Sequence, residues 1–177
     1  MREIVALFAS TASSDGHQLG PEMTRRVIEV SGVVMRRRKT VLIASSASGF
    51  QPNELYATLV QDGLVSLNVH PSQIAVGSPS ASTVAEIDGM ERWLNEQDEQ
   101  SVVYVASGWY QVPRTRFIWW WRHRRQTRSL YLRMKGVPKM YLLLRIMMEP
   151  LKFALYFVLS TKAQDSANQR ILGPKGL

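Results

Sequence analysis

The residues best suited to bind or transform a ligand lie in one short segment, Ser107-Gly-Trp-Tyr-Gln-Val-Pro-Arg114. Two aromatic side chains in it, Trp109 and Tyr110, can stack on a flat ligand. Gln111 can hydrogen-bond the same ligand, and Arg114 can hold an anionic group through two parallel hydrogen bonds. In a loop, aromatic side chains next to an arginine are not easily explained as part of the hydrophobic core. We therefore predict that this segment binds a ligand.

Two further segments carry hydroxyl groups that suit an anion. Ser45 and Ser46 offer hydroxyls and closely approachable backbone amides, while Ser82 and Thr83 stand where a helix is expected to begin. The free N–H groups and the dipole at such a helix start favour a phosphate, sulfate or carboxylate. Ordinary helix capping by Ser82 or Thr83 is the structural alternative.

Two acidic residues, Glu54 and Glu86, lie nearest to these segments and are the candidates for a catalytic base. Glu86 stands three residues after Thr83, so the two also match a capping box, in which each side chain bonds the other's backbone N–H. Glu86 therefore has a structural interpretation beside the catalytic one.

Several familiar catalytic signatures are missing from the sequence. Neither Gly-x-Gly-x-x-Gly nor Gly-Lys-Ser/Thr occurs, which argues against a standard dinucleotide dehydrogenase or P-loop enzyme. The three histidines stand in separate segments, so we predict no metal site. The absence of cysteine excludes thiolate catalysis and disulfides and favours a reducing, cytoplasmic compartment.

Charge is divided unevenly along the 177 residues. Residues 1–99 hold eight Lys/Arg against twelve Asp/Glu, whereas residues 100–177 hold fourteen against two. Such a basic stretch attracts phosphate-rich partners such as nucleic acid, nucleotides or anionic lipid, although a merely solvated basic face has the same composition.

Three consecutive tryptophans, Trp119 to Trp121, stand in this basic stretch, in a segment expected to be helical. Three consecutive positions cover most of the circumference of a helix, so at least one indole must point away from the core. An exposed tryptophan beside arginine suggests a homo-oligomer surface, a membrane headgroup contact or a nucleic-acid contact.

The elements that must position these residues follow from hydrophobic periodicity. Apolar runs predict strands at 3–10, 40–44, 74–76, 101–106 and 129–133, and helical spacing predicts helices at 21–39, 53–60, 83–97 and 114–126, with 63–71 as a connection. This alternation predicts an α/β, three-layer Rossmann-like fold, a parallel sheet of about five strands flanked by helices. Ligands bind such sheets at the carboxyl ends of the strands, where the segments described above converge.

The most apolar stretch, 139–160, predicts one more helix. Arg145, Glu149 and Lys152 share one face of it, so an amphipathic helix covering the sheet is favoured over a membrane span, with contact to an anionic membrane through 119–159 as the alternative. Pro150 can divide the helix into two. We expect one domain over 1–160 and a disordered tail over 161–177.

Several of these residues follow one another in a particular order along residues 4–125. They are Arg25 or Arg26, Ser45-Ser46, Glu54, Ser80-Ala-Ser-Thr83 with Glu86, and Ala106-Ser107 through Tyr110-Gln111-Val-Pro-Arg114. In this order the chain resembles the YdcF-like family (ElyC/SanA/YdcF, domain of unknown function 218), a widespread bacterial family. The resemblance implies a cytoplasmic or membrane-associated protein with a role around the bacterial envelope.

The resemblance also implies a ligand class, and the chain differs from the family pattern at several positions. S-adenosylmethionine or a phosphorylated carbohydrate or lipid carrier are the expected ligands. The glycines expected after the first two strands are replaced by Phe8-Ala9 and Ser46-Ala47, which narrows the approach of a ligand to the backbone. Gln111 stands where the family has a histidine, and an amide cannot shuttle a proton at neutral pH.

Two hypotheses follow from the sequence. In the first, the protein binds a small anionic or nucleotide-like ligand at the strand ends, and whether it also acts on that ligand stays open. Arg25 and Ser107 would line that site, Ser45, Ser46, Ser82 and Thr83 would hold the anion, Glu54 and Glu86 would orient the ligand or act as base, and Tyr110, Gln111 and Arg114 would close the site.

In the second hypothesis the protein is a binding module without catalysis. The basic segment 114–139 and its tryptophans would contact an anionic membrane or, as a less favoured partner, nucleic acid. A site lined by Tyr110 favours the first hypothesis, and a solvent-facing Trp120 beside Arg124 favours the second.

Overall fold

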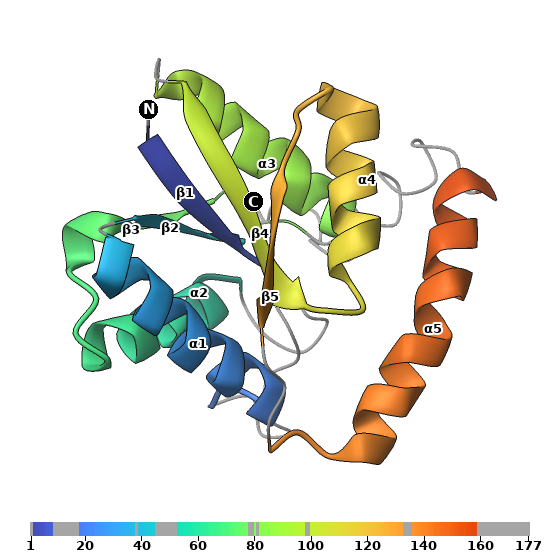
Figure 1. Ribbon diagram of the computed structural model, residues 1–177, viewed down its shortest axis with the longest axis horizontal. Helices are drawn as coiled ribbons and strands as arrows, with labels where there is room; N and C mark the ends of the chain where they lie inside the picture. The colour runs from blue at the N-terminus through green and yellow to red at the C-terminus, as the bar shows by residue number, and fades with distance from the viewer. Residues whose placement is uncertain are drawn as a thin grey trace, which may run out of the picture.

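The computed structural model describes residues 2–8, 18–37, 39–44, 53–77, 80, 82–97, 100–132 and 136–158, with the backbone alone described at 37, 53–55, 141, 145, 152, 153 and 155–158. Strands and helices alternate along these residues (Figure 1). In chain order they are β1 (Arg2–Leu7), α1 (Pro21–Arg37), β2 (Thr40–Ile43), α2 (Asn53–Ser66), the 3-10 turn η1 (Pro71–Gln73), β3 (Ile74–Val76), α3 (Thr83–Glu96), β4 (Ser101–Gly108), α4 (Val112–His123), β5 (Arg128–Leu132) and α5 (Lys139–Val158).

The five strands form one sheet in the order β3-β2-β1-β4-β5, and every neighbouring pair is parallel. From β1 the chain adds β2 and β3 on one side and then crosses to add β4 and β5 on the other. The order therefore reverses between β1 and β4, the switch point at which open parallel sheets bind ligands. The predicted α/β, three-layer Rossmann-like fold is confirmed.

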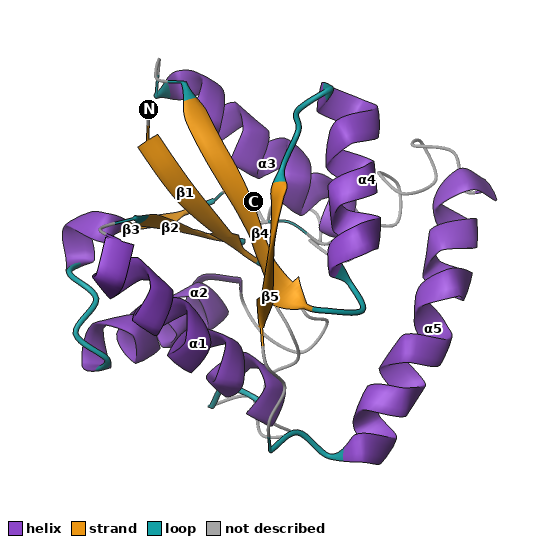
Figure 2. Ribbon diagram, in the orientation of Figure 1, coloured by secondary structure: helices purple, strands orange, loops and turns teal. Residues whose placement is uncertain are grey.

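Both faces of the sheet are buried by helices, which explains why the strands are almost continuously apolar (Figure 2). Val5 and Leu7 of β1 point to the side covered by α1 and α2, where they join a core that includes Val27. Ile4 and Ala6 point to the opposite side, into a core supplied by α3 and α4. All four helices begin at the carboxyl edge of the sheet, so four helix N-termini face that edge.

The prediction that residues 63–71 form a connection is wrong, because α2 continues to Ser66. A Cβ atom at Gly63 would lie 3.3 Å from Cγ1 of Val27, tighter than ordinary van der Waals contact. The absence of a side chain at Gly63 therefore allows α2 to approach α1 closely. The neighbouring Leu64 is fully buried in the same core.

The helix α5 departs most from the prediction. It is a single helix that continues through Pro150 rather than two, and it stands beside α4, away from the sheet (Figure 1). Leu144 and Met147 are 60% and 66% exposed, so the expectation that this helix covers the sheet is wrong. Its apolar side chains find no open sheet face because α1 to α4 already cover both. Within the described residues no helix has the length and apolar character needed to cross a bilayer.

Candidate functional site

A buried arginine lies at the switch point of the sheet. Arg26 of α1 is fully buried; its Nη1 donates to the backbone oxygen of Phe8 at the end of β1 (2.8 Å). Its Nη2 donates to Oε1 of Gln111 at the start of α4 (2.8 Å) and also pairs with Glu22. One guanidinium thus connects α1 to the carboxyl ends of both strands that flank the switch point.

The partners of Arg26 are connected in turn to the segment that follows β4. Ser107 Oγ donates to the same Gln111 Oε1 (2.6 Å), and the Tyr110 hydroxyl donates to Glu22 Oε1 (2.6 Å). We call these five residues, Glu22, Arg26, Ser107, Tyr110 and Gln111, the Arg26 cluster. Their hydrogen bonds hold the turn between β4 and α4 in one conformation.

Local sequence accounts for the position of the Arg26 cluster. Pro21 opens α1, which places the carboxylate of Glu22 in the first turn, where the helix dipole favours it. Arg26 follows at i+4, the spacing at which opposite charges meet on a helix. Glycine is required at 108, because a Cβ there would lie 2.8 Å from Cε1 of Tyr110. This glycine lets the tyrosine fold back onto Glu22.

The N-terminus of α4 is open to an anion in a way that the N-terminus of α3 is not. Ser82 caps α3, its Oγ accepting from the N–H of Ala85 (3.2 Å), and Glu86 adds a negative charge in the first turn. The capping residue of α4 is Gln111, which makes no side-chain capping bond, and the first turn of α4 holds no acidic residue. Uncapped N–H groups with the positive end of the dipole are suited to bind an anion.

The amide of Gln111 is oriented by its neighbours. A guanidinium only donates hydrogen bonds, so the oxygen of the amide must face Arg26. This leaves the Nε2 amino group as a donor that has no partner among the described residues. The backbone N–H of Gln111 itself donates to Gly108 O (2.8 Å), so the open donors are Nε2 of Gln111 and the N–H groups in the first turn of α4 that follows it.

The structure brings together three of the predicted site residues, Ser107, Tyr110 and Gln111. Of the two arginines weighed, it places Arg26 in the cluster, whereas the half-buried Arg25 pairs with Glu29 one turn further along α1 (3.3 Å). Sequence reasoning missed Glu22. The signal available was the i, i+4 pair with Arg26 directly after a proline.

Other predicted residues lie elsewhere. Arg114 pairs with Glu149 of α5 (2.7 Å, Nε to Oε2), and both side chains are mostly buried. The predicted capping box of Thr83 and Glu86 is wrong by one position, because Ser82 is the capping residue and Thr83 is the first residue of the helix. The alternative that Ser82 caps the helix is confirmed.

Some predictions fall outside the described residues. Ser45 and Ser46 lie there, as do the side chain of Glu54 and the tail over 161–177. Within the described ranges, no group of three His, Asp or Glu side chains is close enough to hold a metal ion.

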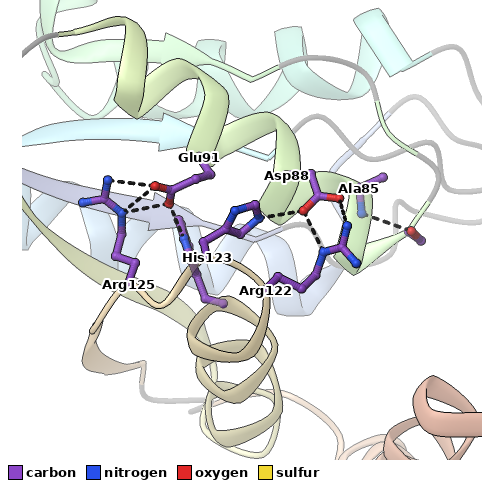
Figure 3. A network of polar contacts seen from close by, with 8 residues as sticks. Ala85, Asp88, Glu91, Arg122, His123 and Arg125 are labelled. Atoms are coloured by element: carbon purple, nitrogen blue, oxygen red, sulfur yellow. Dashed lines mark hydrogen bonds and ion pairs between the residues drawn. The ribbon is translucent and has the colours of Figure 1, made fainter. Parts of the chain in front are cut away.

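Part of the basic segment is neutralised where α3 meets α4 (Figure 3). Asp88 pairs with Arg122 in a bidentate contact (2.9 and 2.7 Å) and with His123 (2.7 Å). Glu91 holds Arg125 through three contacts of 2.8–3.0 Å and accepts from Nε1 of Trp119 (2.7 Å). Arg122 and Arg125 therefore join α3 to α4 and to the connection after it, and they form no free basic surface.

The tryptophans divide as the sequence predicts, because Trp119 is buried while Trp120 and Trp121 are 44% and 50% exposed. The guanidinium carbon of Arg124 lies 5.1 Å from the Trp120 ring centroid and 5.6 Å from that of Trp121. Tyr110, by contrast, is 7% exposed and hydrogen-bonded to Glu22. Trp109, 48% exposed, is the aromatic side chain that faces solvent beside the Arg26 cluster.

Comparisons of the chain with protein-family models, with curated proteins and with solved structures found no match. Function is therefore inferred from the residues of the chain itself.

Proposed function

We propose that the protein binds a small anionic or nucleotide-like ligand at the carboxyl edge of the sheet, over the N-terminus of α4. The oriented amide of Gln111 at the switch point carries this proposal. Its Nε2 and the uncapped N–H groups of α4 would donate to the anion, and the exposed ring of Trp109 would stack on a flat part of the ligand.

Arg26 acts in this proposal as a positioning residue. Its charge is already paired with Glu22, so it contributes by fixing the orientation of Gln111 rather than by neutralising the ligand. A buried ion pair generally gives little net stability, so its presence at the switch point is better explained by the conformation that it imposes on the turn.

The resemblance to the YdcF-like family adds the proposed setting, bacterial envelope metabolism, and the ligand classes S-adenosylmethionine, phosphorylated carbohydrates and phosphorylated lipid carriers. Because Gln111 cannot transfer a proton at neutral pH, binding is the part of the proposal that the residues support, and no reaction is assigned.

A thermal-shift screen with nucleotides, S-adenosylmethionine and phosphorylated sugars tests the proposal. The sharpest variant is Gln111→Glu, in which a carboxylate still accepts from Arg26 and Ser107 but offers no donor and repels an anion. We expect it to lose the ligand-induced shift while remaining folded. Gln61→Glu on α2 makes the same change of charge away from this edge and should respond like the unchanged protein.

A second pair of variants tests the stacking contact. Trp109→Ala should weaken ligand binding, and Trp121→Ala, which removes an equally exposed indole from α4, should not. If no compound shifts the melting temperature, or if Gln111→Glu binds as well as the unchanged protein, the proposed site is wrong.

The exposed faces of α4 and α5 favour a second candidate function, contact with an anionic membrane. On α4, Trp120 faces solvent beside Arg124. Large apolar side chains described on α5 are also exposed, and they are Met140, Leu143, Leu144, Met147, Met148 and Leu151. Apolar and tryptophan side chains beside cations suit the headgroup region of a bilayer.

Co-sedimentation with anionic and with neutral phospholipid vesicles checks this candidate. We expect binding to anionic vesicles only, lost in Leu144→Glu but kept in Val65→Glu, which places the same charge on an exposed apolar site of α2. A second copy of the chain covering this face would instead give a dimer in analytical ultracentrifugation, and that result would exclude the membrane candidate.

A further inference from the structure

A groove of about 500 Å³ opens at the amino ends of β4 and β5, the edge of the sheet opposite the Arg26 cluster. Ser101 and Arg128, the first residues of these two strands, lie on one wall, with Gln126 and Thr127 of the preceding connection. The helix α4 contributes Arg116 and Trp120. In Figure 1 this edge lies at the top, where α4 ends and β5 begins.

The two arginines of the groove carry charge that no described residue neutralises. Arg116 donates to Ser129 Oγ (2.9 Å) and Arg128 to the Tyr104 hydroxyl (3.3 Å), and both acceptors are uncharged. Among the described arginines after residue 100, those at 114, 122 and 125 each pair with a carboxylate. The positive charges of Arg116 and Arg128 are therefore available to an anionic ligand in the groove.

An aromatic ring stands beside these cations. Trp120 is 44% exposed and lines the groove, and Arg124, which also has no acidic partner within the described ranges, lies over its ring. An exposed indole flanked by arginine provides a surface on which a nucleobase can stack, and stacking of this kind tolerates any base.

Two hydroxyl groups in the groove wall lack partners. Ser101 Oγ and Thr127 Oγ1 are both shielded from solvent and hydrogen-bond to no described residue, and Thr127 is only 5% exposed. Buried polar atoms are normally paired, so an unpaired hydroxyl in a binding wall indicates a missing partner. Rotation about one bond would turn the Ser101 hydroxyl towards a bound group.

We propose that this groove binds a nucleotide unit, with its base on Trp120 and its phosphate held by Arg116 and Arg128. The exposed amide of Gln126 and the hydroxyl of Ser101 would bond polar atoms of the base or sugar. The volume lies within the usual range for small-ligand sites, roughly 300–1,000 Å³. The nucleotide is either free or one residue of a single-stranded nucleic acid, since both present the same base and phosphate.

Two titrations at low salt distinguish these sources. Calorimetry with mononucleotides measures the free form, and fluorescence anisotropy with a labelled twelve-residue oligothymidylate measures the strand. Binding of either that is lost in Trp120→Ala and kept in Trp109→Ala supports the groove as a nucleotide site and identifies the source. The proposal is overturned if neither binds, or if inorganic phosphate competes as well as a nucleotide, because the base then contributes nothing.

Charge-matched variants test the residues. Arg116→Gln and Arg128→Gln should each weaken binding about tenfold and lower the salt dependence by about one phosphate contact. Arg122→Gln removes the same charge from the same helix, but its partner is Asp88, so the affinity should change less than about twofold. An equal loss in Arg122→Gln would show general attraction by the basic surface and overturn the site.

The tryptophans provide a second matched pair. Trp120→Ala should abolish most of the binding and Trp121→Ala, its equally exposed neighbour, should not. The same pair separates this groove from the carboxyl edge: nucleotide binding lost in Trp109→Ala but kept in Trp120→Ala belongs to the Arg26 cluster, and the reverse pattern belongs to the groove. Either inference can therefore fail without the other.

Discussion

The two edges of the sheet use charge in opposite ways. At the carboxyl edge the charged groups of the Arg26 cluster are buried and paired with each other, and they fix a backbone turn and one amide. At the amino edge Arg116 and Arg128 are exposed, and neither has an acidic partner among the described residues. Charge at the first edge is part of the fold, whereas charge at the second is available to a ligand. Substitutions at the two edges should therefore affect stability very differently.

The largest effect is expected from Arg26→Met. Removal of one partner of a buried ion pair leaves the other charge uncompensated, so the free energy of unfolding should fall by about 3–5 kcal/mol. Arg25→Met, at the neighbouring residue, removes one partner of the half-buried Arg25–Glu29 pair and should cost about 1 kcal/mol. Urea denaturation measures both, and equal losses would mean that Arg26 is not the structural centre of this edge.

Gly108→Ala should come next, with a loss of about 1–3 kcal/mol, because the added methyl group would press on the ring of Tyr110. Gly32→Ala gives the contrast. Its new Cβ would lie 3.4 Å from the flexible end of Arg36, and alanine favours a helix over glycine by about 1 kcal/mol. Thermal unfolding should show opposite signs for the two variants.

Trp119→Phe should cost about 1–3 kcal/mol, since it leaves the buried Glu91 carboxylate without the indole donor at 2.7 Å. Trp121→Phe, at an exposed position, should change the unfolding free energy by less than about 0.5 kcal/mol. A large loss at residue 121, found by urea denaturation, would show that the exposed tryptophans belong to the folded core.

The smallest effect is expected in the groove itself. Arg116→Gln and Arg128→Gln should leave the unfolding free energy within about 0.5 kcal/mol of the unchanged protein, because each loses a hydrogen bond to a neutral group but no ion pair. A marked loss of stability in either variant would remove the contrast between the two edges.

Much of the fold was predictable because periodicity along the chain reflects burial. The short strand Ile74–Val76 was predicted with its observed bounds, and the apolar run from Ser101 leads directly to the segment that supplies three of the five residues of the Arg26 cluster. The end of α2 at Ser66 was not predictable in the same way, because Gly63 sits inside the helix where it contacts Val27 of α1, and such a contact leaves no pattern along the chain. The sequence also could not show which of Arg25 and Arg26 belongs to the site, since this depends on which of two adjacent helix positions faces the sheet.

The sequence by itself determined the alternation of strands and helices, the parallel sheet and the edge at which Ser107 and Gln111 lie, because these depend on local patterns and on the handedness of crossovers. The tertiary structure alone decided which charges are satisfied. Tyr110 meets Glu22 across 88 residues and Arg125 meets Glu91 across 34, so no spacing along the chain records these contacts. It also decided that α5 stands away from the sheet, because α1 to α4 already fill both faces.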